Sequence, residues 1–177
     1  MLTLDPFASP DDHGSIPPHL YSYETGRPFD TCLMCGGTLN GPESERYEIQ
    51  KCYRNSEVVL EFSICENCGS NLGQEYSKES EQVIGRFILE IFLRCELGRQ
   101  GCHKCAQPMP EAGNHLVTAI CQRSELLFPP VYVCEGCEDQ LHEQLSKKTR
   151  DLFGEFIGGH FPGVPEGLEA PTLGVFR

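Results

Sequence analysis

Four Cys-x-x-Cys motifs constrain this chain more than any other feature. They form two sets, each with a gap of about thirty residues: Cys32-Leu-Met-Cys35 with Cys65-Glu-Asn-Cys68, and Cys102-His-Lys-Cys105 with Cys134-Glu-Gly-Cys137. The sets are offset by nearly the same number of residues (102 − 32 = 70 and 134 − 65 = 69). Four cysteines at this spacing can close a tetrahedron around zinc, because both sulfur atoms of a pair face the same ion. The sequence predicts two four-cysteine sites and two zinc ions per chain.

Each predicted site offers four sulfur ligands and leaves no position for water, which is typical of a structural metal centre and not of a catalytic one. Iron also binds four thiolates, so zinc and iron both remain open as the metal. The pairs come in matched sets, which argues against a thioredoxin-like redox role for any single motif. The chain has 11 cysteines, and an odd count is less typical of a disulfide framework.

The chain has no stretch resembling a membrane span or a secretion signal. No apolar run approaches about 20 residues, and the first residues lack a basic start followed by an apolar segment. Glycine (18) and proline (13) are plentiful, as expected of short elements joined by turns. We expect a small cytoplasmic protein stabilised by its metals.

The net charge of −12 argues against nucleic acid as a partner. Nucleic-acid binding depends on cationic side chains that neutralise phosphates, and a strongly acidic surface opposes it. Residues 147–150 (Lys-Lys-Thr-Arg) are the one local exception. A solvated helix face is the preferred interpretation of that cluster.

The motifs divide the chain into four segments. Residues 1–30 are rich in proline and lack a helical or strand period, so we expect a flexible or surface-wrapping N-terminal arm in which His13 and His19 are solvent histidines. Residues 31–95 and 96–160 form the first and second zinc-finger repeats. Residues 161–177 form an irregular C-terminal tail.

Each repeat is predicted to contain a zinc knuckle, a β-hairpin and a helix. In the first, Gly36-Gly37 suits a tight knuckle turn, residues 47–52 and 58–64 are β-rich runs, and apolar residues recur at helical spacing after Cys68. This layout resembles a treble-clef zinc finger. A zinc ribbon would bring its second ligand pair from another hairpin instead. The resemblance implies a small α+β metal-stabilised fold shared by many functions.

The second repeat aligns with the first along most of its length. With one deletion after the first motif, Cys52 coincides with Cys121, Arg54 with Arg123, and Phe87 with Phe156. We predict an internal duplication in which the two repeats pack about a pseudo-twofold axis. One fused body is favoured, since each unit alone could not bury its helix face.

Three cysteines lie outside the motifs. Cys52 and Cys121 form a possible additional thiol site, as reactive thiols or ligands of a second type of metal site, but a small buried side chain is the commoner use of cysteine. Cys95 is expected to be buried in packing. His103 is expected to decorate its knuckle and not to bind metal.

The enzyme question is open on sequence alone, with a non-enzymatic function preferred. Some treble clefs are metal-dependent nucleases that use histidines on the hairpin and helix, and Asn114-His115 and His142 are candidates for such roles. The pattern is incomplete because the first repeat lacks matching residues. No nucleophile elbow or phosphate loop is present.

We therefore carry three functional hypotheses. The first is a zinc-stabilised protein–protein interaction or adaptor module with an unidentified protein partner, in which residues 126–130 (Leu-Leu-Phe-Pro-Pro) are either a docking segment or a core strand. The second is nucleic-acid binding or a degenerate HNH-like nuclease, using residues 147–150, His115 and His142. The third is a thiol-based metal or redox sensor. Homo-oligomerisation is left open.

Overall fold

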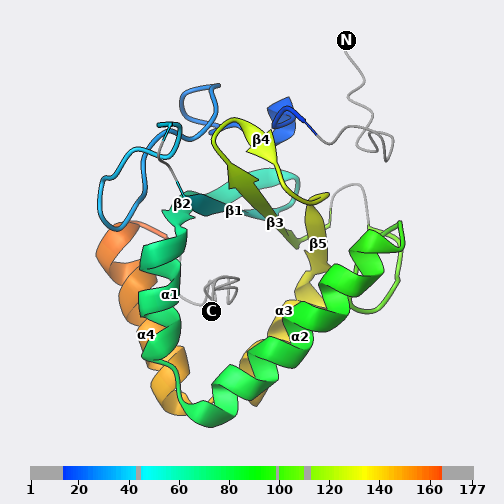
Figure 1. The fold of residues 1–177 in the computed structure, drawn as a ribbon. Coiled ribbons are helices and arrows are strands. Elements are labelled where there is room, and N and C mark those ends of the chain that lie inside the picture. Colours follow the sequence, from blue (N-terminus) through cyan, green and yellow to red (C-terminus); the bar gives the residue numbers. More distant parts are fainter. Residues whose placement is uncertain (1–13, 43–44, 99, 110–112, 165–177) are drawn as a thin grey trace.

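The computed structural model describes residues 14–42, 45–98, 100–109 and 113–164 (Figure 1). The start of the predicted arm, with His13, and most of the predicted tail lie outside these residues. The strands are β1 (Arg46–Arg54), β2 (Glu57–Cys65), β3 (His115–Gln122), β4 (Glu125–Leu126) and β5 (Val131–Cys134). The helices are α1 (Glu66–Gln74), α2 (Lys78–Glu96), α3 (Glu135–Gln144) and α4 (Lys147–His160), with a short 3-10 helix, η1 (Pro18–Leu20). The fold is a small α+β arrangement.

Two hairpins join into one antiparallel sheet. β1 pairs with β2 on one side and with β3 on the other, and β4 and β5 both pair with β3. The second hairpin is interrupted between β4 and β5, where Pro129 and Pro130 have no N–H group to donate to a neighbouring strand. Residues 126–130 are therefore not a continuous core strand: Leu126 ends β4, and residues 127–130 are irregular.

Each long apolar-periodic stretch after the cysteines forms two helices instead of the one expected. The first stretch breaks before α2, where Ser77 has an extended backbone and its hydroxyl accepts a hydrogen bond from Ser80 N at 3.2 Å. The second breaks before α4, where Ser146 caps Thr149 N in the same way at 3.3 Å. A serine at the N-cap satisfies a free amide and stabilises a new helix start.

The long helices cross to the opposite half of the chain. We call residues 31–98 the first half and 100–164 the second half. In Figure 1 the helices form a V beneath the sheet, with α1 and α4 drawn in one arm and α2 in contact with α3 in the other. On α4, Phe156 packs edge-to-face on Phe62 of β2 with ring centroids 5.3 Å apart, and Phe153 packs on Tyr76 at 5.3 Å. Each half thus completes the core of the other.

The N-termini of α2 and α4 meet at the point of the V. Ser77 N donates to Thr149 Oγ1 at 3.1 Å, and Ser146 N donates to Ser80 Oγ at 2.9 Å. Ser80 and Thr149 are both 0% exposed. The two helix starts therefore cap each other through buried hydroxyls as well as themselves, which ties the halves together with polar contacts that have directional geometry.

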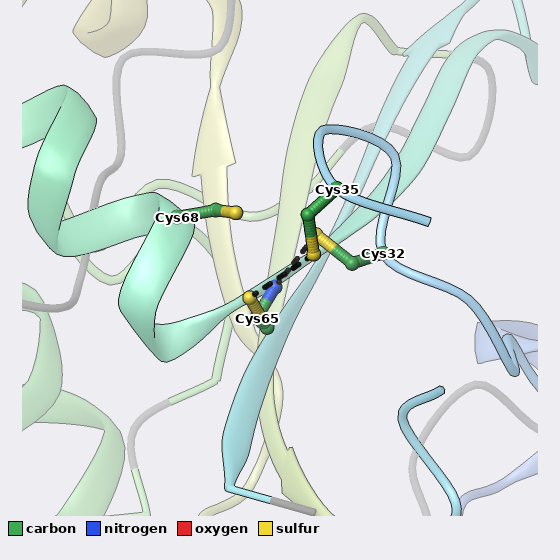
Figure 2. A group of neighbouring side chains, drawn as sticks. All are labelled: Cys32, Cys35, Cys65 and Cys68. Atoms are coloured by element: carbon green, nitrogen blue, oxygen red, sulfur yellow. Dashed lines mark hydrogen bonds between the residues drawn. The ribbon is translucent and has the colours of Figure 1, made fainter. Parts of the chain in front are cut away.

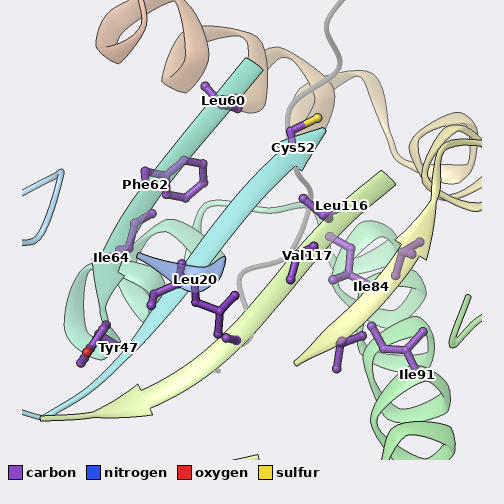
Figure 3. Packing of buried hydrophobic residues seen from close by; sticks show 14 of the residues in the cluster. Leu20, Tyr47, Cys52, Leu60, Phe62, Ile64, Ile84, Ile91, Leu116 and Val117 are labelled. Carbon is purple, nitrogen blue, oxygen red and sulfur yellow. The ribbon is translucent and has the colours of Figure 1, made fainter. Parts of the chain in front are cut away.

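Both faces of the sheet are covered. The helices cover the face that carries Phe62 and Leu116; Figure 3 shows part of this core, including Ile84 and Ile91 of α2. Residues 14–30 lie over the other face, where Ser22 Oγ donates to Glu61 Oε1 at 3.0 Å. Lys51 Nζ, on a side chain only 3% exposed, pairs with Glu61 Oε2 at 3.0 Å.

None of the described helices combines the length and the apolar character that crossing a lipid bilayer requires.

Candidate metal centres

The first centre gathers cysteines from three elements. Cys32 and Cys35 lie on the loop before β1, Cys65 is the last residue of β2, and Cys68 lies in the first turn of α1 (Figure 2). The four sulfur atoms lie within 4.8 Å of one another, and Cys35 Sγ is 3.9 Å from Cys65 Sγ. A tetrahedral ion with Zn–S bonds of about 2.3 Å separates its ligands by about 3.8 Å. The geometry is that of a four-cysteine metal site.

The second centre repeats this arrangement. Cys102 and Cys105 precede β3, Cys134 ends β5, and Cys137 lies in the first turn of α3. Its sulfur atoms also lie within 4.8 Å of one another, with Cys105 Sγ 3.7 Å from Cys134 Sγ. The structure therefore brings together all eight cysteines that the spacing assigned to metal, in the two sets of four that were expected.

Hydrogen bonds from backbone amides lower the pKa of one cysteine in each centre. Cys65 N donates to Cys32 Sγ at 3.3 Å, and Cys134 N donates to Cys102 Sγ at 3.3 Å. Burial opposes ionisation of Cys32, but N–H groups of Cys65, Cys35 and Met34 outweigh it and lower the pKa of Cys32 to about 7. The same balance of burial and amide donors lowers the pKa of Cys102 to about 7. A thiolate is the form that binds metal.

One further ligand in each centre, Cys68 and Cys137, is harder to ionise when no cation is bound. The pKa of Cys68 is raised by burial and then by the neighbouring cysteines, and burial and the neighbouring cysteines raise the pKa of Cys137 as well. Four thiolates this close repel one another strongly, so a bound divalent ion is what allows all four to ionise together. Both centres can therefore hold a metal ion, with all four positions supplied by protein.

The knuckles turn through a residue with positive φ. Gly36 has φ 69° and donates its N–H to Cys32 O at 2.8 Å. Ala106 occupies the corresponding place in the second knuckle, with φ 63° and an N–H···O bond of 2.8 Å to Cys102 O. The left-handed conformation is free of strain for glycine and costs an alanine about 1 kcal/mol or more. The second knuckle thus carries strain that the first avoids.

This difference predicts opposite effects for two reciprocal substitutions. Gly36→Ala is expected to lower the free energy of unfolding by about 1 kcal/mol, because an added Cβ meets nothing within 4 Å and only the backbone conformation is penalised. Ala106→Gly is expected to raise it, by up to about 1 kcal/mol. Chemical denaturation of the metal-bound protein measures both. A change of the same sign in the two variants would contradict this explanation.

Cys52 and Cys121 do not form one site. Cys52 faces Leu60 and Leu116, on the helix-covered side of the sheet, whereas Cys121 faces Tyr47, which by strand alternation lies on the other side. Both are 0% exposed, and burial raises the pKa of each to about 12. Such thiols are poor nucleophiles at neutral pH. Cys95 is also buried, and its Sγ lies 3.4 Å from Pro129 O.

The alignment of Cys52 with Cys121 is corrected by the strand register. Tyr47 faces Cys65 in the first hairpin, and His115 faces Cys134 in the second. The paired residues are 18 positions apart in the first hairpin (65 − 47) and 19 in the second (134 − 115), so an alignment that follows the strand register has an offset of 68 at this strand and not 69. The irregular segment between β4 and β5 holds the additional residue that the sequence alignment missed.

His103 and His115 are held by contacts within the fold. His103 is 6% exposed, and its Nδ1 accepts a hydrogen bond from Tyr132 N at 2.9 Å. His115 stacks on Tyr53, with ring centroids 4.6 Å apart, and burial lowers its pKa. Among the described residues, the only groups of three or more cysteine, histidine or acidic side chains able to share an ion are the two sets of four cysteines. His115 and His142 belong to neither set.

The basic cluster at residues 147–150 is partly engaged within the chain. Lys147 Nζ pairs with Asp151 Oδ2 at 2.6 Å, and Arg150 Nη1 donates to Leu145 O at 2.9 Å. The Asp151 carboxylate offsets part of the charge of Lys147, whereas a hydrogen bond to a carbonyl leaves the charge of Arg150 unchanged. The Lys147 side chain is 81% exposed, which agrees with the expectation of a solvated helix face.

Sequence reasoning missed two features. Arg54 of β1 lies 3.5 Å from Glu135 Oε1 and 3.6 Å from Glu138 Oε2, so it links the first hairpin to the helix that carries Cys137. Leu89 and Leu93 on α2 and Leu97 at its C-cap are exposed; their four-residue spacing, opposite the core face, was the available signal. No protein-family model, curated protein or solved structure matches this chain.

Proposed function

We propose that the chain is a non-enzymatic, zinc-stabilised protein–protein interaction module. The observation that carries this proposal is a row of leucines on the outside of a body with two closed metal centres. Leu89 is 70% exposed, Leu93 55% and Leu97 65%. We call these three residues the leucine row. Scattered apolar residues on a surface are ordinary, but an aligned row along one helix is typical of a docking face.

Zinc is the metal that the donor set supports best. Four thiolates at tetrahedral separations, held by backbone amides, suit a structural zinc ion, and no ligand position remains for a substrate or a reactive water. The proposed site residues are Cys32, Cys35, Cys65, Cys68, Cys102, Cys105, Cys134 and Cys137. In this proposal the two ions contribute folding energy and no chemistry.

The proposed architecture is a duplication of a treble-clef-like unit. Each half has a knuckle, a hairpin, and a helix whose first turn brings the last cysteine. The offset of 68 maps Gln50 onto Thr118, and these two residues face each other in the pairing of β1 with β3. A twofold axis through that pair exchanges the halves and also exchanges the crossed hydrogen bonds between α2 and α4. The repeats at 31–95 and 96–160 are then parts of one body and not separate domains.

Phe128 of the interrupted second hairpin adds apolar surface beside α2. It is 37% exposed and packs edge-to-face against Phe92 of α2 with ring centroids 6.1 Å apart. Leu126, in the same segment, is buried. A net charge of −12 favours a protein partner over nucleic acid.

A site-specific photocrosslinker tests the proposal. The probe replaces Leu93, and a matched variant carries it at Glu79, an exposed residue in the first turn of the same helix. After irradiation in extracts of cells that naturally produce the chain, we expect protein adducts from position 93 and few from position 79. Adducts to nucleic acid, or equal labelling at both positions, would contradict the proposal.

A further inference from the structure

The outer face of α2 has the pattern of a short helix-pairing seam. Arg86, Leu89, Leu93 and Glu96 recur with spacings of three, four and three residues, and all four side chains are exposed. This is the alternation of a and d positions along a two-helix seam, in which Arg86 and Leu93 are a positions and Leu89 and Glu96 are d positions. The core side of α2, with Ile84 and Ile91, is already buried.

We propose that this face binds α2 of a second copy of the chain, in antiparallel orientation. This inference rests on the proposed interaction function and names the partner. An antiparallel seam places a positions of one helix against d positions of the other. Centred on the level of Ile91, it sets Leu89 against Leu93 of the second copy, because they lie two residues before and after the centre.

The charges select the same register. Arg86 and Glu96 lie five residues before and after Ile91, so the register that pairs the leucines also sets each arginine against a glutamate of the second copy. Within the described chain, no salt bridge involves Arg86 or Glu96. A parallel pairing in register would set arginine against arginine and glutamate against glutamate, which is unfavourable.

The four layers give a self-complementary interface. Two central leucine layers are closed at each end by an arginine–glutamate layer, and twofold symmetry uses every contact twice. Four layers bury little area compared with a stable obligate dimer. We therefore expect reversible association, with monomer and dimer exchanging at micromolar concentrations.

A charge exchange at the end layers tests the pairing. Sedimentation equilibrium of the metal-bound protein is expected to show a dimer of the 19.8 kDa chain. Arg86→Glu alone and Glu96→Arg alone are each expected to weaken it about tenfold or more, because both end layers become like-charged. Mixing the two single variants restores complementary layers, so the mixture should form a heterodimer about as stable as the wild type. Glu79→Arg, the matched control, changes charge one heptad before Arg86, where α2 of the second copy, which ends at Glu96, has no residue opposite, and it should leave dimerisation unchanged.

Each contrary outcome points to a different failure. A wild-type chain that stays monomeric at 100 micromolar, on the order of the highest concentration a reversible dimer of this size needs, overturns the second copy as partner. Adducts of another protein at Leu93 would then still uphold the interaction function. A dimer whose single variants are not rescued by mixing overturns the antiparallel register. Absence of any protein adduct at Leu93 overturns the proposed function itself.

Discussion

Replacing Cys68 with alanine is expected to unfold the whole chain and not only the half that contains it. A structural zinc site contributes about 10 kcal/mol or more of apparent folding free energy, which is as large as the total stability of a typical domain. α1 would lose its attachment to the knuckle, and α4, which packs on that side of the fold, would lose the surface beneath it. Circular dichroism and amide hydrogen exchange should show loss of structure in both halves, together with loss of both metal ions.

The matched control is Cys95→Ala. Cys95 is buried but belongs to neither four-cysteine group, so its removal should cost about 1 kcal/mol and leave two metal equivalents bound. If Cys68→Ala lost one equivalent while the second half kept its full hydrogen-exchange protection, the halves would be independent. That result would contradict the crossed arrangement of the helices.

Phe156→Ala is expected to destabilise the protein by about 3 to 5 kcal/mol, the usual cost of removing a buried aromatic ring. Phe156 is 8% exposed and lies on α4 in the second half, but its ring packs against Phe62 in the first half. Hydrogen exchange should therefore increase most strongly in β2 and around Tyr76, which are distant from Phe156 in sequence. Denaturant titration with metal present measures the loss of stability.

Tyr23→Ala is the control for this experiment. Its side chain is 80% exposed, so the substitution should change the stability by no more than about 0.5 kcal/mol. A Phe156→Ala variant as stable as this control would show that α4 does not complete the core of the first half. So would increased exchange confined to the second half.

The metal centres were predictable because their signal is local. A pair of cysteines with two residues between them needs only a knuckle turn or the first turn of a helix to face one ion, and both turns follow from nearby residues such as Gly36. The small α+β character of the fold could be expected on similar grounds, because β-rich runs and helical spacing are also local patterns. The periodicity of apolar residues, however, does not show whether a helix packs on its own half of the chain or on the other half.

The crossed helices illustrate that limit. α2 and α4 each present an apolar face that could pack on its own half or on the other, and the sequence pattern is identical in either case. Ser77 and Ser146 carried a usable cue, since each is an N-cap residue inside an apolar-periodic stretch. The register of β3 was harder to predict. One additional residue between β4 and β5 shifts β3 by one position in the sequence alignment, while the spacing between the cysteine motifs stays nearly the same in the two sets.

Stepwise chelation, with released metal and circular dichroism followed in the same sample, tests whether the metal ions hold the two halves together. We expect two zinc equivalents per chain whose release coincides with a single cooperative loss of structure in both halves. Metal that leaves while the fold persists would contradict it, as would a third equivalent that leaves separately from the two cysteine centres.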